Sequence, residues 1–188
     1  MIPARLLAPL AALALLAAGC GDDDKDSGSS GGTNAATTPA QTETTEEAPQ
    51  ASTGKAPKVD NATDLASKPQ VDPPAGDPPT TLIKEDLVVG EGKAIKKGQL
   101  AAMQYVGISW STGKQFDASW DRGGQPFQFP LGGGQVIAGW DEGIPGMKVG
   151  GRRILVIPPD KGYGAAGAGP DIAPNETLVF VVDLVGIG

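Results

Sequence analysis

The stretch Gln135–Met147 (QVIAGWDEGIPGM) constrains the fold more than any other, because it alone carries apolar residues at helical spacing. Its apolar side chains recur at spacings of one, three and four residues: Val136, Ile137, Trp140 and Ile144. This spacing predicts the apolar face of a two-turn helix, with Asp141 and Glu142 turned away. A single short helix among strands is expected to lie across a curved sheet and close one end of its core. Trp140 is then either the largest side chain of that core or the floor of a pocket.

Short apolar runs separated by turn residues predict strands on either side of this helix. The predicted strands cover Thr81–Val89, Leu100–Trp110, Gln115–Asp117, Pro126–Leu131, Gly151–Ile157 and Leu178–Ile187. In the last run Asp183 alternates with apolar residues that share the opposite face: Phe180, Val182 and Leu184. These segments predict an α+β fold, an antiparallel sheet of about five strands wrapped around one short helix. The folded domain is expected to span residues 80–188.

The first 20 residues predict a signal sequence for lipid attachment. Arg5 precedes an apolar run of 13 residues, Leu6–Ala18, which is too short to span a bilayer and fits the core of a signal peptide. The run ends in AAGC, which resembles a bacterial lipobox and contains Cys20, the only cysteine of the chain. We expect removal of residues 1–19, lipidation of Cys20, and an extracytoplasmic protein anchored to the outer face of a bacterial cell membrane. The alternative is an ordinary secretory signal followed by a cysteine with no such role.

Residues 20–79 are predicted to form a disordered tether that begins with the lipidated Cys20. They are rich in Ser, Gly, Thr, Ala, Gln and Glu, with proline more frequent toward residue 79, and they contain no aromatic residue. Such a composition cannot bury enough apolar surface to fold on its own. The alternative is that part of this segment folds onto the domain.

Composition excludes several kinds of chemistry. The chain contains no histidine, which excludes His-based catalytic triads, His general bases and His metal ligands. A single cysteine excludes intrachain disulfides and all-Cys zinc sites. Residues 80–188 hold 11 acidic and 10 basic side chains, a net charge of −1, so nothing suggests nucleic-acid binding. We expect neither a metal nor a cofactor.

Most aromatic residues of the predicted domain lie where a strand or helix meets a loop: Tyr105, Phe116, Phe127, Trp140, Tyr163 and Phe180. Packing alone could account for any one of them. Asp117 is harder to explain, because a carboxylate directly after Phe116 at a strand end is costly to bury alone. It would need a hydroxyl or an arginine as its partner.

Seven segments together resemble the FKBP-type peptidyl-prolyl cis-trans isomerases, in the order and spacing of that family. They are QYVG (104–107), GKQFDAS (113–119), PFQF (126–129), VIAGWDEG (136–143), MKVG (147–150), YG (163–164) and TLVF (177–180). The resemblance runs from about residue 80 to residue 188. It implies an antiparallel half-barrel sheet around a short helix, in agreement with the pattern of strands above.

The resemblance also implies roles for individual residues. Trp140 would be the floor under a proline ring, and the walls would be Tyr105, Phe116, Phe127, Phe180, Val136, Ile137 and Ile172. Ile137 would also offer its backbone N–H to a substrate carbonyl. Tyr163 would place its hydroxyl near the prolyl amide, and Asp117 would be the polar group of the wall. Partners implied are proline-containing polypeptides and the macrolide inhibitors that bind the family, with the protein acting as a monomer.

The family pattern is not kept throughout. Ala168 stands where many members carry an aromatic residue or histidine, and Gly169-Pro170-Asp171 also departs from the commoner pattern. Substrate preference and the rim of the pocket are therefore the features that the resemblance leaves open.

Two other functions remain as alternatives. A proline-peptide binding module or holdase chaperone would use the same pocket, but chaperone-type relatives carry a large insertion where this chain has only a short Gly-rich connection from Phe129 to Val136. A hydrolase would need paired carboxylates, for which the candidates are Asp117, Asp121, Asp141 and Glu142. The last two are expected on a solvated helix face.

Overall fold

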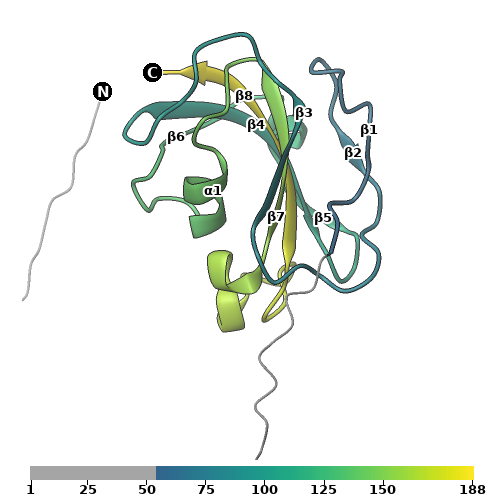
Figure 1. The fold of residues 1–188 in the computed structure, drawn as a ribbon. Coiled ribbons are helices and arrows are strands. Elements are labelled where there is room, and N and C mark those ends of the chain that lie inside the picture. The colour runs from purple at the N-terminus through teal and green to yellow at the C-terminus, as the bar shows by residue number, and fades with distance from the viewer. Residues whose placement is uncertain (1–53) are drawn as a thin grey trace, which may run out of the picture. The chain divides into compact units, whose positions relative to one another are not determined.

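The computed structural model describes residues 54–188 (Figure 1). The predicted signal peptide, Cys20 and the first part of the predicted tether lie outside the described residues. Within the described part of the chain, no helix has the length and apolar character needed to cross a membrane.

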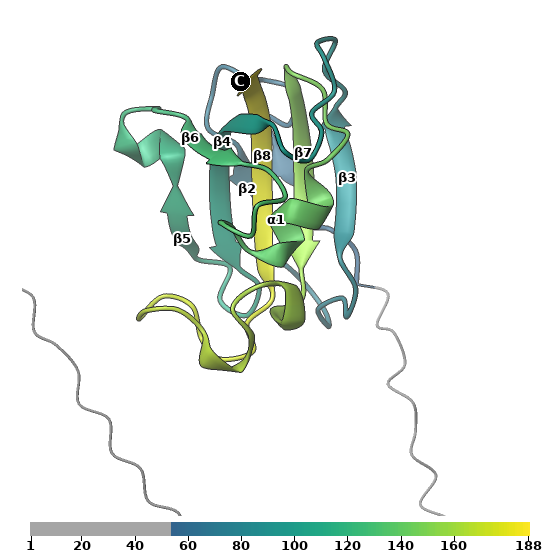
Figure 2. The same ribbon diagram turned by 90° about the vertical axis from the view of Figure 1, so that its left-hand side faces the viewer.

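Six antiparallel strands form the main sheet. They are β3 (Ile83–Val88), β4 (Leu100–Ser109), β5 (Gln115–Ala118), β6 (Phe127–Pro130), β7 (Gly151–Ile157) and β8 (Leu178–Ile187). Their order is β3-β7-β8-β4-β5, and β6 pairs with β4. One short helix, α1 (Ala138–Gly143), lies across one face of the sheet (Figure 2). The predicted fold class is thereby confirmed, and the bounds of β7 and β8 coincide with the predicted ones.

Three 3₁₀ turns complete the elements beside the sheet: η1 (Ser119–Arg122), η2 (Pro159–Lys161) and η3 (Gly164–Ala166). The first connects β5 to the segment before β6, and the other two lie between β7 and β8. All three are loops at the margin of the sheet, where side chains can be presented without belonging to the core.

The helix starts later than its apolar pattern predicts. Ile137 has extended backbone angles (φ −59°, ψ 148°), so Val136 and Ile137 precede α1 instead of lying on it. Close packing on β7 fixes the helix in place: a Cβ at Gly139 would lie 2.4 Å from Cγ2 of Ile157. This contact holds the following Trp140 over the sheet.

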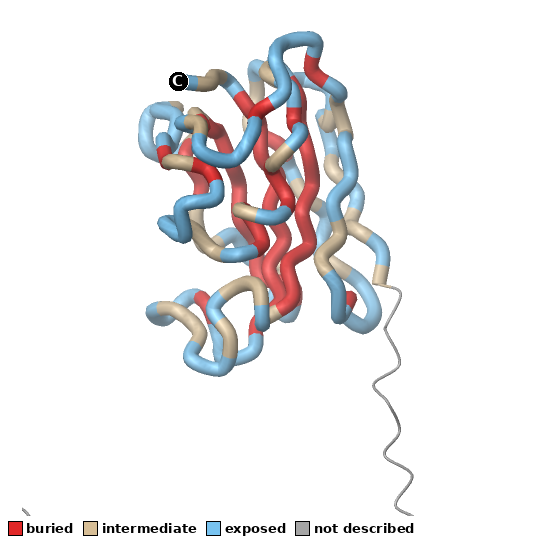
Figure 3. The backbone as a smooth tube through the Cα atoms, turned by 60° about the vertical axis from the view of Figure 1, so that its left-hand side comes forward, coloured by how far each residue is buried: buried red, intermediate tan, exposed pale blue. Residues whose placement is uncertain are grey.

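The central strand β8 is buried on both faces. Phe180, Val182 and Leu184 belong to the core beneath α1, whereas Val179 and Val181 belong to a second apolar cluster on the opposite face. Figure 3 shows this burial along the central strands. An antiparallel sheet often leaves one face in water, but this pattern requires that something cover the second face.

Residues 54–79, here called the strap, cover that face. The structure differs from the predicted tether in this part: β1 (Val59–Asp60) and β2 (Gln70–Val71) pair antiparallel and lie on the side of the sheet away from α1 (Figure 1). Ala56, Val59 and Val71 pack against the second apolar cluster. The few aliphatic residues of the strap suffice because they add to an apolar surface that the sheet already provides.

Arg152 links the strap to the core. Its side chain is fully buried and makes a bidentate ion pair with Asp183, at 2.6 Å from Nε and 2.8 Å from Nη2. Its other donor bonds go to strap carbonyls, at 3.1 Å to Asn61 and 3.2 Å to Ser67. A buried ion pair is tolerated only when its remaining donors are satisfied, so the strap supplies acceptors that this pair requires.

We predict that a protein comprising residues 80–188 is much less stable than one comprising residues 54–188. Removing the strap exposes the second apolar cluster and leaves Arg152 donors without their carbonyl partners, which together should lower the free energy of unfolding by about 3 kcal/mol or more. Urea unfolding followed by circular dichroism measures this difference. Equal midpoints for the two proteins would show that the strap adds nothing to the fold.

Candidate active site

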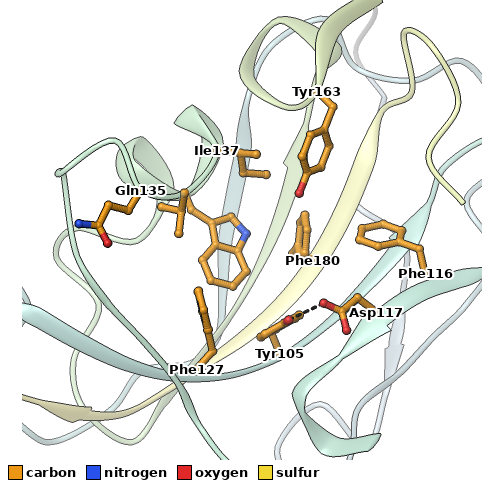
Figure 4. Close-up of a pocket in the computed structure, with 10 residues that line it drawn as sticks. Tyr105, Phe116, Asp117, Phe127, Gln135, Ile137, Tyr163 and Phe180 are labelled. Carbon is orange, nitrogen blue, oxygen red and sulfur yellow. Dashed lines mark hydrogen bonds between the residues drawn. The ribbon is translucent and has the colours of Figure 1, made fainter. Parts of the chain in front are cut away.

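A pocket of about 190 Å³ opens on the side of the sheet that carries α1 (Figure 4). All the predicted catalytic and substrate-binding residues except Ile172 line it, together with Gln135: Tyr105, Phe116, Asp117, Phe127, Val136, Ile137, Trp140, Tyr163 and Phe180. They come from β4, β5, β6, α1 and β8 and from the loops beside them. The structure thus gathers into one site residues that are up to 75 positions apart, from Tyr105 to Phe180.

Ile172 is not among the residues that line this pocket. It is buried in the core beneath α1, and its backbone forms an isolated antiparallel bridge with Ala168 in the loop between η3 and β8. Its place in the wall stays a prediction.

Trp140 forms the floor. Its ring centroid lies 5.3 Å from those of both Tyr105 and Phe180, with interplanar angles of 79° and 83°. Such edge-to-face contacts are the favoured arrangement of aromatic pairs. Its indole Nε1 is buried and has no hydrogen-bond partner among the described residues. Aromatic packing therefore holds the floor in place.

Phe116 and Phe180 form one wall through a T-shaped contact at 5.4 Å. The arrangement depends on Gly107 of β4 behind them. A Cβ at Gly107 would lie 2.6 Å from Phe116 and 2.8 Å from Phe180. The missing side chain at position 107 is what lets both rings sit side by side against the sheet.

Asp117 has both kinds of partner that a carboxylate at this position is expected to need, a hydroxyl and an arginine. Tyr105 Oη donates a hydrogen bond of 2.5 Å to Asp117 Oδ2, and the Arg122 guanidinium donates to Asp117 Oδ1. Arg122 Nη2 also donates to Tyr105 Oη at 2.6 Å. Burial, then the Asp117 carboxylate, raise the pKa of Tyr105, while Arg122 opposes them. The phenol therefore stays protonated and acts as a donor.

The sequence pattern does not predict a role in the site for Arg122 or Gln135. Arg122 is the only basic residue between β5 and β6, so the need of Asp117 for a cation could have pointed to it. Gln135 is an exposed residue at the pocket rim and follows the glycine turn with no distinguishing pattern of its own.

Two polar groups of the pocket remain available to a ligand. Ile137 N–H donates no hydrogen bond within residues 54–188, because it precedes the first turn of α1. Tyr163 is half-exposed, and in Figure 4 its hydroxyl points into the pocket toward Phe180. Both are donors, and they face a cavity lined mainly by aromatic and aliphatic side chains.

The other candidate carboxylates are engaged away from the pocket. Asp141 accepts hydrogen bonds from the backbone N–H groups of Gly132 and Gly134, at 2.7 and 3.0 Å, and so fixes the turn before α1. Glu142 pairs with Lys161 at 2.8 Å, and Asp121 pairs with Lys68 at 2.7 Å. Among residues 54–188, Asp117 is the only carboxylate that lines the pocket, so these residues do not supply the paired carboxylates of a hydrolase there.

The arrangement suits binding of an apolar ring with an attached amide. Aromatic rings surround the cavity, and its donors are the few groups described above. Within residues 54–188 no cluster of His, Cys, Asp or Glu has the composition to hold a metal ion. The pocket can therefore exclude water from a bound group and place donors against a carbonyl.

Comparison with known proteins agrees with this geometry. A family model described as FKBP-type peptidyl-prolyl cis-trans isomerase matches residues 91–185. A protein of Streptomyces anulatus named FK506-binding protein is 55% identical over 121 residues, covering 64% of this chain and 97% of that protein. A probable FK506-binding protein of Corynebacterium glutamicum is 52% identical over 118 residues, covering 63% and 97%. The crystal structure of AtFKBP13 is similar with a TM-score of 0.53 at 42% identity, covering 57% of this chain and 93% of that one.

We predict opposite shifts in the pKa of Tyr105 from its two polar partners. Arg122→Met removes a donor and a positive charge that lower this pKa, and so should raise it further. Asp117→Asn removes a carboxylate that raises it, and so should lower it. The chain contains two tyrosines, so ultraviolet titration in a Tyr163→Phe background isolates Tyr105. Shifts of the same sign in both variants would contradict the described network.

Proposed function

The chain belongs to the FKBP-type peptidyl-prolyl cis-trans isomerase family, and on this premise we propose that its pocket accelerates rotation about Xaa-Pro bonds in extracytoplasmic proteins. The observation that carries the proposal is the aromatic cavity over Trp140 with donors at its edge. A proline ring on this floor would bring its own amide bond between the walls.

Desolvation and stabilisation of the twisted amide would together lower the barrier. Resonance makes the peptide bond planar and opposes rotation by about 18–20 kcal/mol. The planar amide carries more separated charge than the twisted one, so an apolar aromatic cavity disfavours the planar form. The free Ile137 N–H would donate a hydrogen bond to the substrate carbonyl, and the Tyr163 hydroxyl would lie near the prolyl amide. Donors that bind the twisted geometry more strongly add selective stabilisation.

The Asp117, Tyr105 and Arg122 group would act as a preset polar wall. The three side chains satisfy one another in the described structure, so none needs to rearrange when substrate enters. A preorganised dipole of this kind acts without a reorganisation cost during the reaction. The proposed mechanism requires no nucleophile and no general base.

A proline-peptide binding module with incidental turnover is the second candidate. One observation weighs against it: between the end of β6 at Pro130 and the start of α1 at Ala138 there is only a short glycine-rich turn. A chaperone function would need an additional surface for unfolded chains, and this connection provides none.

We further propose that macrolides compete for the pocket. Two relatives that this chain matches over nearly their whole length carry FK506-binding in their names. A macrolide that binds them would occupy the same cavity between Phe116, Trp140 and Phe180 here.

The predicted signal sequence and Cys20 support a proposed location at the outer face of a bacterial cell membrane. We also propose that the domain acts as a monomer. Between Cys20 and the first described residue lie 33 residues (21–53). Fully extended, they would span at most about 115 Å. A tether reaching to residue 79 would have had 59 residues, so the folded strap roughly halves the maximum distance from a lipid anchor.

An isomerase assay on residues 54–188 tests the main proposal. We predict faster cis-to-trans conversion of Xaa-Pro peptides than in buffer, and inhibition by FK506. Phe127→Ala, which removes a half-exposed wall ring, should lower kcat/KM by about tenfold, on the order of 1.4 kcal/mol. The matched control is Val89→Ala, an exposed apolar residue outside the pocket. A wild-type rate equal to that in buffer would refute the isomerase proposal. Suppressed aggregation of an unfolded protein, without isomerase turnover, would favour the binding module.

Labelling with a lipid precursor tests the anchor. In a bacterial host, the wild-type chain should incorporate a labelled fatty acid and sediment with membranes. Cys20→Ser should abolish both, because no other cysteine is present. Unlabelled wild-type protein in the culture medium would point instead to an ordinary secretory signal.

A further inference from the structure

The strap contacts the turn η1, which directly follows β5, through Lys68. Its Nζ donates to both carboxylate oxygens of Asp121, at 2.7 and 2.9 Å. Asp121 lies in η1 and also accepts a 2.7 Å hydrogen bond from Gln115 Nε2 of β5. The Lys68–Asp121 pair therefore ties the strap to the turn and strand that border the pocket.

Lys68 is presented by a fixed turn of the strap. The Asn61 side chain donates to the Lys68 carbonyl at 3.0 Å and to Ser67 Oγ at 2.8 Å. The buried Arg152 donates to the Ser67 carbonyl at 3.2 Å. Because its backbone is held on both sides, Lys68 has less freedom to lose than an ordinary surface lysine when it binds Asp121.

The turn that Lys68 holds carries Arg122, which binds two side chains of the pocket wall. Arg122 directly follows Asp121 and binds both Asp117 and the Tyr105 hydroxyl. At the other end of η1, the Ser119 hydroxyl accepts a 2.8 Å hydrogen bond from Tyr105 N–H. A shift of η1 would therefore move the Arg122 guanidinium, which binds both polar side chains of the pocket wall.

We infer that Lys68 is a positioning residue for the isomerase site. It holds η1 so that Arg122 keeps its hydrogen bonds to Asp117 and Tyr105 and fixes both side chains in the pocket wall. The inference rests on the proposed function. Lys68 lies outside the segment that matches the family model, residues 91–185, so this support comes from a part of the chain that the family match does not include. The strap thus contributes to the pocket as well as to the opposite face of the sheet.

Solvent exposure sets the size of the expected effect. The side chains of Lys68 and Asp121 are 35% and 52% exposed, so the pair is screened and its loss should be modest. In the full chain, Lys68→Met should lower kcat/KM by about threefold, and Lys68→Arg should restore most of it. Lys58→Met is the matched control, because Lys58 is an exposed strap lysine whose side chain has no polar partner among the described residues.

A double-variant cycle separates positioning from general destabilisation. If Lys68 acts through Arg122, then Lys68→Met should have no further effect on kcat/KM in an Arg122→Met background. An equal loss in both backgrounds would overturn the inference. So would an unchanged kcat/KM in Lys68→Met while the wild type is active.

A second readout does not depend on catalysis. In the Tyr163→Phe background, Lys68→Met should raise the Tyr105 titration midpoint in the same direction as Arg122→Met, and Lys58→Met should leave it unchanged. A wild type without isomerase activity would refute the proposed function, and this titration would still decide whether Lys68 positions the wall. An unmoved midpoint would overturn the positioning role.

Discussion

The structure depends on a mismatch of size between one helix and the sheet beneath it. A helix of six residues is about 9 Å long, whereas a strand of ten residues such as β8 extends about 33 Å. The helix α1 therefore cannot cover the face on which it lies. Large side chains from β4, β5, β6 and β8, most of them aromatic, line the part of this face that α1 leaves uncovered, and the space between them is the pocket. The binding cavity is the uncovered part of the core.

The residues that the sequence identified best are those whose pattern is local. The sequence predicts two strands to the residue: Leu178–Ile187 alternates around Asp183, and Pro158 and Pro159 end the segment Gly151–Ile157. Nine wall and floor residues could be named through the family resemblance. The start of α1 differs from the prediction because Val136 and Ile137 have helical spacing, whereas Val136 lies in a bend and the backbone of Ile137 is extended.

The features of the fold and the site that cannot be predicted from the sequence depend on contacts between distant segments. The strap looks like a linker because its apolar residues are too few for a core, and only the exposed face of the folded sheet gives them a partner. Its bonds to Arg152 span 85 and 91 residues. The role of Arg122 cannot be predicted from the sequence for a similar reason. Its role appears only when η1 brings it over the Tyr105 ring, at 5.5 Å from the centroid.

The position of β8 makes folding depend on contacts between distant segments. The strand follows the other strands of the sheet in sequence, yet it lies between β7 and β4 and pairs with both. It also carries Asp183, the partner of the arginine on which the strap docks. Neither half of the sheet can join the other, and the strap cannot form its bonds to the buried ion pair, before β8 is in place. Contacts of such long sequence separation require long loops to close first, so the domain is expected to fold slowly and as one cooperative unit.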